Sequence, residues 1–256
     1  MSTEERRFRS TVRHYVAGRL RYPPPLVAAV AQALALDGTS RLLDLGCGPG
    51  FLALAFAPCV AEVVAMDPEP AMLEAARDAA RGQAGNVTFV LGSSHDLASE
   101  LGRFVLVTMS RSFHWMDRPR TLATLDGMIE PGGGVALFAD DHPQCEENAW
   151  YGAWRATRDR HAGSAPRAKD HERVLASSPF SCIRRLTERY RRRTTVDELV
   201  ERALSTSTTS PERLGTARAA FEDEIRAGIT PHAVDGAVSE LVEAEALLAT
   251  RPPPAD

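Results

Sequence analysis

The chain has 256 residues, of which 44% are hydrophobic and 25% are charged, and its formal net charge is −4. These values are typical of a globular protein with a sizeable core, built as one large or two small domains. The negative charge excludes a global attraction to nucleic acid or anionic membranes, and no apolar run approaches the length of a bilayer span.

The cysteines give no sign of a metal centre or a disulfide framework. Cys47, Cys59, Cys145 and Cys182 form no CxxC pair and lack the spacing of zinc ligands. We therefore expect no bound metal. The first residues carry no apolar signal region, so the sequence predicts a cytoplasmic protein.

Two helices are predicted before the first strand. Residues 4–20 place an apolar stripe on one helical face, and three prolines at 23–25 interrupt the pattern. Residues 26–36 form an Ala-rich helix that ends at Asp37-Gly38.

Residues 41–50, Arg-Leu-Leu-Asp-Leu-Gly-Cys-Gly-Pro-Gly, are the stretch around which the chain is organised. Leucines on both sides of Asp44 indicate a short buried strand, and residues 51–56 are expected to be helical. A strand that passes through a glycine turn into a helix presents bare backbone N–H groups and a helix N-terminus to a ligand. Glycine also removes the Cβ that would hold the ligand away.

A second strand, residues 62–67, ends in Asp67 roughly twenty residues later, as in a nucleotide-binding βαβ unit. This carboxylate can accept hydrogen bonds from both hydroxyls of a ribose. Alternatively it caps the next helix, whose start Pro68 and Pro70 favour. The glycine spacing is GxGxG, and Phe51 stands where a dinucleotide fold has its third glycine, which argues against a nicotinamide cofactor.

Further strands are predicted at residues 86–91 and 104–109. Ligands in open α/β sheets bind beyond the carboxyl ends of the strands. We therefore expect the loop after the second of these strands, with Ser110 and His114, to border the site.

Residues 119–129 are amphipathic, and a Pro-Gly-Gly-Gly turn at 131–134 leads into a fifth strand at 135–139. His142 follows that strand on the ligand side. A helix is predicted from Gln144 to Arg160, with aromatic side chains that belong to the core or to an apolar substrate wall.

The last part of the chain closes the sheet. Residues 182–193 alternate and are rich in arginine, which we interpret as a strand with a solvated face, not a nucleic-acid patch. Helices are predicted at 196–204 and 221–227, and an antiparallel last strand at 238–249.

Several ordered motifs carry a family resemblance. They are the GxGxG turn, the segment Val63–Ala76 with its strand-end acid, Phe113-His-Trp-Met-Asp117, and Ile129-Glu-Pro-Gly-Gly-Gly-Val-Ala-Leu-Phe138. Together they resemble the class I S-adenosylmethionine-dependent methyltransferases, in particular the small-molecule branch called methyltransferase type 11. The resemblance covers roughly residues 12–140, and an ordered set of motifs is more specific than any single one. The chain departs from the family at Ser93 and Val105, where the family has acids.

The resemblance implies an α/β fold, a doubly wound, Rossmann-like and mostly parallel seven-stranded sheet with helical cap insertions and an antiparallel last strand. It implies one methyltransferase domain over residues 1–256. Within it, residues 1–36 would form lid helices, 41–140 the cofactor-binding core, and 144–235 the cap helices and closing strands.

The cofactor implied is S-adenosyl-L-methionine. Tyr15 and Arg19 would reach its methionine end, with the arginine on the carboxylate, although a packing tyrosine and a surface arginine are equally compatible with the sequence. Ser93 replaces the aspartate that contacts the adenine amino group in the family, so that contact is in question. The residues expected to bind the cofactor are Tyr15, Arg19, Asp44, Gly46, Cys47, Gly48, Gly50, Asp67, Pro68, Met72, Ser93, Ser94, His95 and Ser110.

The implied activity is methyl transfer to a small-molecule acceptor, with an oxygen of a metabolite or natural-product intermediate as the first expectation. His114 and His142 are the candidate bases, which are needed only if the acceptor must lose a proton. His114 beside Trp115 is alternatively a loop support, and the segment around His142 is alternatively a helix cap. A different class is a cofactor-binding protein that acts as a cyclase or pericyclase, or as a partner of another enzyme. No nucleic-acid or membrane partner is expected, and the chain is expected to be a monomer or a homodimer.

Overall fold

The computed structural model describes residues 11–162 and 170–253, so the predicted helical stripe over residues 4–10 lies outside the described residues. The chain divides into two compact units. The core unit comprises residues 21–139, 168–188 and 244–256, and the cap unit comprises residues 1–20, 140–167 and 189–243. The interpretation of the chain as one domain stays a prediction.

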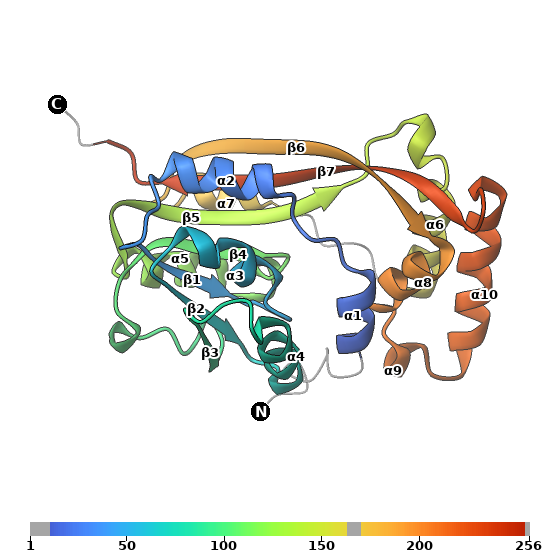
Figure 1. The fold of residues 1–256 in the computed structure, drawn as a ribbon, viewed down its shortest axis with the longest axis horizontal. Coiled ribbons are helices and arrows are strands. Elements are labelled where there is room, and N and C mark those ends of the chain that lie inside the picture. Colours follow the sequence, from blue (N-terminus) through green and yellow to red (C-terminus); the bar gives the residue numbers. More distant parts are fainter. Residues whose placement is uncertain (1–10, 163–169, 254–256) are drawn as a thin grey trace. The chain divides into compact units, whose positions relative to one another are not determined.

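A seven-stranded sheet has the order β3-β2-β1-β4-β5-β7-β6 (Figure 1). β1 pairs in parallel with β2 and β4, β2 with β3, and β4 with β5, whereas β7 runs the opposite way. The predicted doubly wound, mostly parallel Rossmann-like α/β fold with an antiparallel last strand is thereby confirmed. The strands are β1 (Arg41–Leu45), β2 (Glu62–Asp67), β3 (Val87–Leu91), β4 (Phe104–Ser110), β5 (Ile129–Asp141), β6 (Cys182–Thr195) and β7 (Ala237–Thr250).

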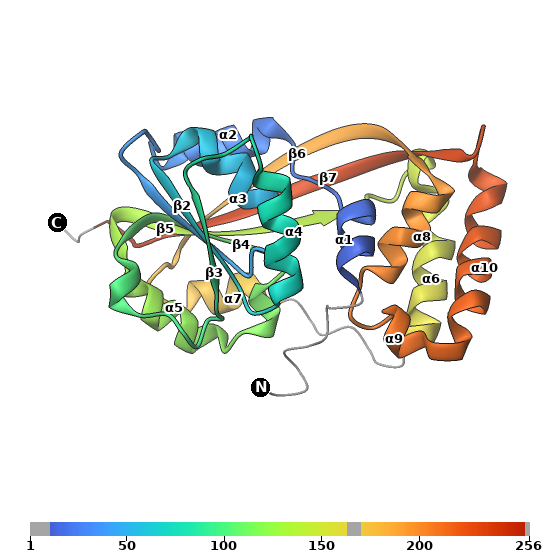
Figure 2. The same cartoon turned by 60° about the horizontal axis from the view of Figure 1, so that its bottom comes forward.

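Helices cover both faces of the sheet in the core unit. Figure 2 shows α2 and α3 on one side of the sheet and α5 and α7 on the other. Leu43 and Leu45 of β1 point to the second side and belong to a core cluster with Leu122 of α5 and Leu175 of α7. Because both faces are buried, the inner strands are largely apolar, with Asp44 and Thr108 as buried polar exceptions. The helices of this unit are α2 (Pro24–Ala33), α3 (Phe51–Phe56), α4 (Pro70–Ala80), α5 (Arg118–Asp126) and α7 (His171–Ala176).

The cap unit has its own apolar core. Trp150 and Trp154 are 1% and 4% exposed and belong to a cluster with Phe221 and Ile225, so these two tryptophans are core residues. A reciprocal capping box between Thr195 and Glu198 starts α8. The helices of this unit are α1 (Val12–Gly18), α6 (Tyr151–Ala162), α8 (Val196–Leu204), α9 (Pro211–Leu214) and α10 (Arg218–Ile229).

Two predicted boundaries are wrong. The fifth strand begins at Ile129, so the three glycines at 132–134 lie inside it and form no turn before it. A Cβ at Gly133 would stand 2.4 Å from the Val105 carbonyl oxygen, and one at Gly134 would stand 2.5 Å from that of Ala249. These glycines therefore permit close packing between neighbouring strands.

The helix predicted from residue 144 begins only at Tyr151. The Asn148 amide donates to the carbonyls of Pro143 and Leu241, each at 2.8 Å, which ties the preceding segment to β7. No helix among the described residues combines the length and the apolar character needed to cross a membrane.

Candidate functional site

The turn between β1 and α3 is built on glycines in the left-handed region. Gly46, Gly48 and Gly50 have φ of +72°, +54° and +78°. A Cβ at Gly46 would approach the Ser112 Cβ to 2.5 Å, because the Ser112 hydroxyl reaches over the turn and donates to the Leu45 carbonyl at 2.8 Å. The turn thus needs glycine for both its backbone conformation and its packing.

The amides of this turn are engaged within the protein, which corrects the expectation of bare N–H groups. The amides of Gly46 and Cys47 donate to the Met66 carbonyl at 2.8 and 3.0 Å. The Gly48 amide donates to Asp67 at 2.8 Å, and the Gly50 amide to the Cys47 carbonyl at 3.0 Å. The absence of side chains, and not a set of free donors, is what the turn offers a ligand.

Asp67 ends β2 beside the glycine turn. Its Oδ2 accepts from the Gly48 amide and its Oδ1 accepts from the Glu69 amide at 2.9 Å. Burial raises the pKa of this carboxyl to about 6, while the hydrogen bonds from Glu69 and Gly48 oppose the rise. The predicted proximity of the acid and the glycine turn is present in the structure, and helix capping falls instead to Glu69, which accepts from the Ala71 amide.

Asp44 is fully buried and joins three elements of the core unit. It accepts from the Thr108 hydroxyl of β4 at 2.9 Å and from the Ala53 amide of α3 at 3.0 Å. Burial raises its pKa to about 7, against the lowering effect of these two hydrogen bonds. These contacts position the start of α3, and the predicted contact of Asp44 with a cofactor stays a prediction.

The other residues predicted to bind the cofactor from this part of the core unit differ in burial and in their contacts. Burial raises the pKa of the Cys47 thiol well above its ordinary value, and the charges of Asp67 and Asp44 raise it further, so the thiol is inert packing. Met72 is buried in α4, whereas Pro68 is exposed. The Ser110 hydroxyl, at the end of β4, lies 3.0 Å from the Tyr22 hydroxyl.

The loop after β3 contains an acid that sequence analysis missed. Asp96 accepts from both the amide and the hydroxyl of Ser93, each at 2.8 Å, and these bonds hold its pKa below the ordinary value. Ser94 is half-buried and His95 is exposed. The three-residue spacing of Ser93 and Asp96 was the available signal, since it is typical of a side-chain-closed turn.

His114 lies in the short 3₁₀ turn Phe113–Trp115, just beyond the carboxyl end of β4. It is half-buried, and its ring centroid is 4.8 Å from that of Trp115. The ring of His171, at the start of α7, stacks at 6.4 Å with an interplanar angle of 28°. His171 was missed because 57 residues separate the two histidines and no local pattern connects them.

Arg111, two residues before this turn, adopts an unfavourable backbone conformation. Arg111 has φ of +52°, and its guanidinium carbon lies 5.2 Å from the ring centroid of Tyr22. Outliers of this kind cost on the order of 1–3 kcal/mol and cluster at binding sites. The segment from Ser110 to Trp115 is therefore a site candidate on conformational grounds as well.

The remaining predicted residues belong to the cap unit. The Arg19 guanidinium lies 5.0 Å from the Tyr15 ring centroid. The His142 side chain is 4% exposed, stacks on Tyr151 at 4.4 Å, and places Nε2 2.6 Å from Oε1 of Glu240. These contacts suit an internal support, and the role of His142 as a base stays a prediction, as do the cofactor contacts of Tyr15 and Arg19.

Glu240 is the centre of a buried polar cluster in the cap unit. It accepts from Arg202 and from the Thr194 hydroxyl in addition to its contact with His142. Burial alone would raise its pKa, but the bond from His142 and the charge of Arg202 outweigh burial and hold the pKa well below the ordinary value. The cluster is satisfied within the unit.

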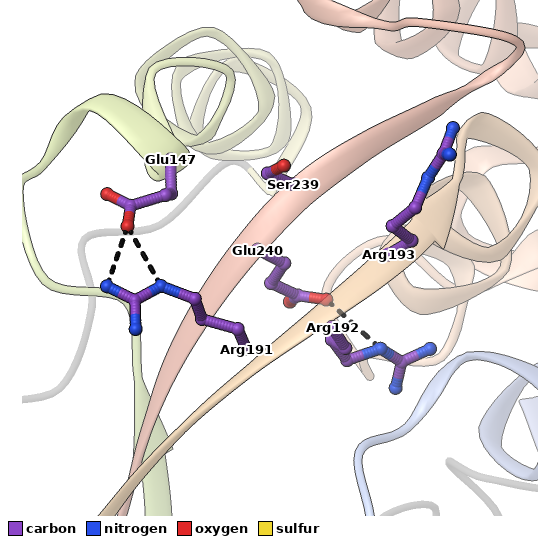
Figure 3. Close-up of a pocket in the computed structure, with 6 residues that line it drawn as sticks. All are labelled: Glu147, Arg191, Arg192, Arg193, Ser239 and Glu240. Carbon is purple, nitrogen blue, oxygen red and sulfur yellow. Dashed lines mark hydrogen bonds and ion pairs between the residues drawn. The ribbon is translucent and has the colours of Figure 1, made fainter.

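A cavity of about 350 Å³ lies beside this cluster, between β6 and β7 (Figure 3). The arginines that line it are already paired. Arg191 contacts Glu147 at 3.0 Å, Arg192 contacts Glu198 at 3.1 Å, and Arg193 donates to the Val234 carbonyl at 2.8 Å. Carboxylates thus compensate Arg191 and Arg192, whereas Arg193 contacts a neutral carbonyl, and the interpretation of this strand as a solvated face stays a prediction.

Comparisons with known proteins show what the core of the chain is similar to. A family model described as a methyltransferase domain matches residues 42–133. An uncharacterized methyltransferase of Mycobacterium tuberculosis is 31% identical over 130 residues, which make up 51% of this chain and 50% of that protein. A ubiquinone biosynthesis O-methyltransferase of Xanthomonas campestris pv. campestris is 36% identical over 110 residues, which make up 42% of this chain and 46% of that protein. The chain spans about half the length of the curated relatives it matches.

Solved structures match over most of the chain. An S-adenosylmethionine-dependent methyltransferase from Thiobacillus denitrificans, in complex with S-adenosyl-L-homocysteine, has a TM-score of 0.53 at 17% identity, covering 98% of this chain and 99% of that one. The [4+2]-cyclase SpnF has a TM-score of 0.54 at 19% identity, and the match covers 92% of this chain and 85% of that one. At these identities the likeness is one of fold. Residues 42–133 therefore match the model of a methyltransferase domain, and the chain shares its fold with S-adenosylmethionine-dependent methyltransferases.

Proposed function

We propose that the chain is an S-adenosylmethionine-dependent methyltransferase that acts on an oxygen of a small metabolite or natural-product intermediate. The observation that carries the proposal is the junction of the glycine turn with Asp67, whose Oδ2 accepts from the Gly48 amide at 2.8 Å at the carboxyl ends of β1 and β2. The name of the Xanthomonas relative, an O-methyltransferase, supports an oxygen acceptor.

The residues at this junction fit the cofactor. Each Asp67 oxygen accepts one internal hydrogen bond and retains a second lone pair, which suits two ribose hydroxyl donors. The glycine turn admits the cofactor close to the backbone. Ser93 and Asp96 supply acceptors for the adenine amino group, in place of the aspartate that is usual in the family.

S-adenosylmethionine, when bound, supplies a methyl group that is already activated on a sulfonium centre. The protein's task is then to align the acceptor and to exclude water. In this proposal a ring nitrogen of His114 accepts the proton of the acceptor hydroxyl, because His114 is half-buried and adjoins the carboxyl end of β4. His142 is assigned to the polar cluster around Glu240.

Calorimetric titration with S-adenosylmethionine, S-adenosylhomocysteine and NADH tests the cofactor assignment. Binding of the first two compounds alone is the expected result. Binding of NADH, or of none of the three, would contradict the proposal. Turnover is then measured as S-adenosylhomocysteine formed with a panel of phenols, alcohols and carboxylic acids.

Substitution of His114 tests the base. His114→Ala is expected to lower turnover with hydroxyl acceptors by about 10²–10⁴-fold, since that is the usual contribution of general-base catalysis. The affinity for S-adenosylhomocysteine should not change. Full activity of the variant would leave His114 as a support for the loop.

A second candidate is a protein that binds the cofactor without transferring its methyl group, as a cyclase, a pericyclase or a partner of another enzyme. The structural likeness to SpnF favours it, as do Ser93 and Val105 at positions where the family has acids. Conversion of a substrate without formation of S-adenosylhomocysteine would establish this candidate in place of the first.

We also propose that the chain acts in the cytoplasm as a single domain, monomeric or homodimeric, without a nucleic-acid or membrane partner. The net charge of −4 and the paired arginines of β6 support this view. Light scattering after size-exclusion chromatography gives the mass, and a mass larger than a dimer would contradict the assembly proposed.

A further inference from the structure

Trp115 presents an exposed aromatic ring beyond the carboxyl end of β4. The residue is 43% exposed, whereas Trp150 and Trp154 are 1% and 4% exposed. Ligands of doubly wound sheets bind at this edge, and the candidate base His114 precedes Trp115 in the same short turn. A ligand that covers the indole removes apolar surface from water, so the position suits an apolar part of the acceptor.

The turn that carries Trp115 is anchored to the interior of the core unit. Phe113 is 2% exposed and belongs to the apolar core cluster of this unit. The Ser112 hydroxyl donates to the Leu45 carbonyl at 2.8 Å, and the Trp115 amide donates to the Ser112 carbonyl at 2.9 Å. The fold therefore fixes the turn that presents the indole, and a preorganised ring loses little conformational freedom when it binds a ligand.

Further aromatic rings adjoin the indole in the core unit. The His114 ring centroid lies 4.8 Å from that of Trp115, with an interplanar angle of 44°. The His171 ring stacks on His114, and its centroid lies 5.4 Å from that of the buried Phe113. Aromatic rings stack or meet edge to face at centroid distances of about 4.5–7 Å. A planar ring placed on Trp115 therefore gains contacts that an aliphatic chain does not.

We propose that Trp115 selects the acceptor and that the acceptor is an aromatic hydroxy compound, a phenol in the wide sense. This inference rests on the proposed function, because it names the substrate class of that reaction. The ring of the acceptor stacks on the indole of Trp115, and its hydroxyl group is directed to the neighbouring His114. A saturated alcohol of the same size gains the burial of apolar surface but lacks the stacking contribution.

The test measures binding to the full chain without turnover. Its probes are phenol and 2-naphthol, each with its saturated counterpart, cyclohexanol and decahydro-2-naphthol. NMR titrations, with and without S-adenosylhomocysteine, give the dissociation constants for the wild type, Trp115→Phe and Trp115→Leu. The first variant keeps an aromatic ring and the second keeps only an apolar side chain. The control is Leu91→Ala, at a 61% exposed position at the end of β3 in the same unit.

The wild type is expected to bind each phenol about two- to tenfold more tightly than its saturated counterpart, which is the usual contribution of an aromatic pair beyond apolar burial. Trp115→Leu should lose this preference and Trp115→Phe should retain it. Leu91→Ala should bind all four probes as the wild type does.

The indole N–H signals show where the probe binds. Protein labelled with ¹⁵N in tryptophan gives a signal for each of its three tryptophans, and the one absent from Trp115→Phe belongs to Trp115. We expect 2-naphthol to shift that signal. The signals of Trp150 and Trp154 should stay in place, because both side chains are nearly inaccessible and their N–H groups donate to backbone carbonyls.

The inference is overturned if the phenols bind no more tightly than their saturated counterparts, if Trp115→Leu keeps the preference, or if the Trp115 signal does not shift. Failure of all four probes to bind overturns it as well. Failure of the wild type to bind S-adenosylhomocysteine would instead contradict the proposed function. The probes titrated without S-adenosylhomocysteine then still decide whether Trp115 binds aromatic rings.

Discussion

Two aspartates at the ends of neighbouring strands differ in what they can still bind. Each oxygen of both carboxylates accepts one hydrogen bond, Asp44 from Thr108 and Ala53 and Asp67 from the Gly48 and Glu69 amides. Asp44 is 0% exposed and Asp67 is 8% exposed, so Asp67 is the acid to which the proposed function assigns the ligand. Burial raises the pKa of both, which makes each a source of pH dependence near neutrality.

For Asp67 we expect cofactor affinity to fall as the pH falls through about 6, because protonation removes the acceptor that the ribose hydroxyls need. Asp67→Asn should bind S-adenosylhomocysteine about 30-fold more weakly or worse at pH 7.5, with little dependence on pH. Calorimetry between pH 5 and pH 8 measures both effects. Asp78→Asn, at an exposed position of α4, is the control, and unchanged affinity of Asp67→Asn would refute the ribose assignment.

For Asp44 we expect pH to change the stability of the folded protein. In the folded protein Asp44 keeps its proton up to a pKa of about 7, whereas an aspartate in the unfolded chain has its ordinary pKa of about 3.8, so the folded state loses stability as the pH rises through this interval. The loss is of the order of 2–4 kcal/mol. Asp44→Asn keeps an acceptor for Ala53 and should lack this part of the pH dependence. Urea unfolding at pH 4.5 and pH 7.5 gives the free energy of unfolding of both proteins. The same change in that free energy between the two pH values in wild type and Asp44→Asn would contradict the raised pKa.

At the scale of elements, the β1–α3 turn holds the site together through close packing. Gly46 lies under Ser112, which belongs to the loop after β4, and the amides of Gly46 and Cys47 bind the end of β2. The turn therefore fixes the ends of three strands relative to one another within the core unit. A side chain at Gly46 would disturb all three.

Gly46→Ala is expected to destabilise the protein by about 3 kcal/mol or more, because the left-handed backbone and the contact with Ser112 both oppose a Cβ. The control is Gly82→Ala. Gly82 has φ of +71° but no atom within 4 Å of its would-be Cβ, so only the backbone cost of about 1–2 kcal/mol applies. Urea unfolding measures both free energies. Similar losses in the two variants would show that the contact with Ser112 is unimportant.

At the scale of the whole molecule, stability depends on charges that are paired far apart in the sequence. His142, Arg202 and Glu240 come from three separate segments and are nearly inaccessible to water. Such a cluster adds little folding stability compared with apolar packing. Removing one of its charged groups is nevertheless strongly destabilising, because the remaining charge stays buried without a partner. The exposed pairs between β6 and β7 carry no comparable cost.

Glu240→Gln should therefore lower the free energy of unfolding by about 3–5 kcal/mol, since the buried Arg202 loses its counter-charge. Glu243→Gln, on the same strand and paired with the exposed Arg189, should cost less than about 1 kcal/mol. Fluorescence of Trp150 and Trp154, measured with Trp115→Phe in every variant, follows the cap unit. If the chain is one domain, fluorescence and circular dichroism change in a single transition, and two separate transitions would refute that interpretation.

Much of the fold could be predicted because its signals are local. Continuous apolar runs indicated β1, β2 and β4, and the predicted bounds of α3 and α8 agree with the structure. The glycines of residues 132–134 were misread as a turn, because glycine signals both turns and close strand packing, and only the neighbouring strands distinguish the two.

The sequence by itself determined the nucleotide-type βαβ unit, the glycine turn and its acid, because hydrophobic periodicity and backbone requirements act over a few residues. Only the tertiary structure decided that the turn amides are internally bonded and that His171 stacks on His114. Those properties depend on segments that lie far apart in the chain. Which charges are compensated is a property of packing, and a linear pattern does not contain it.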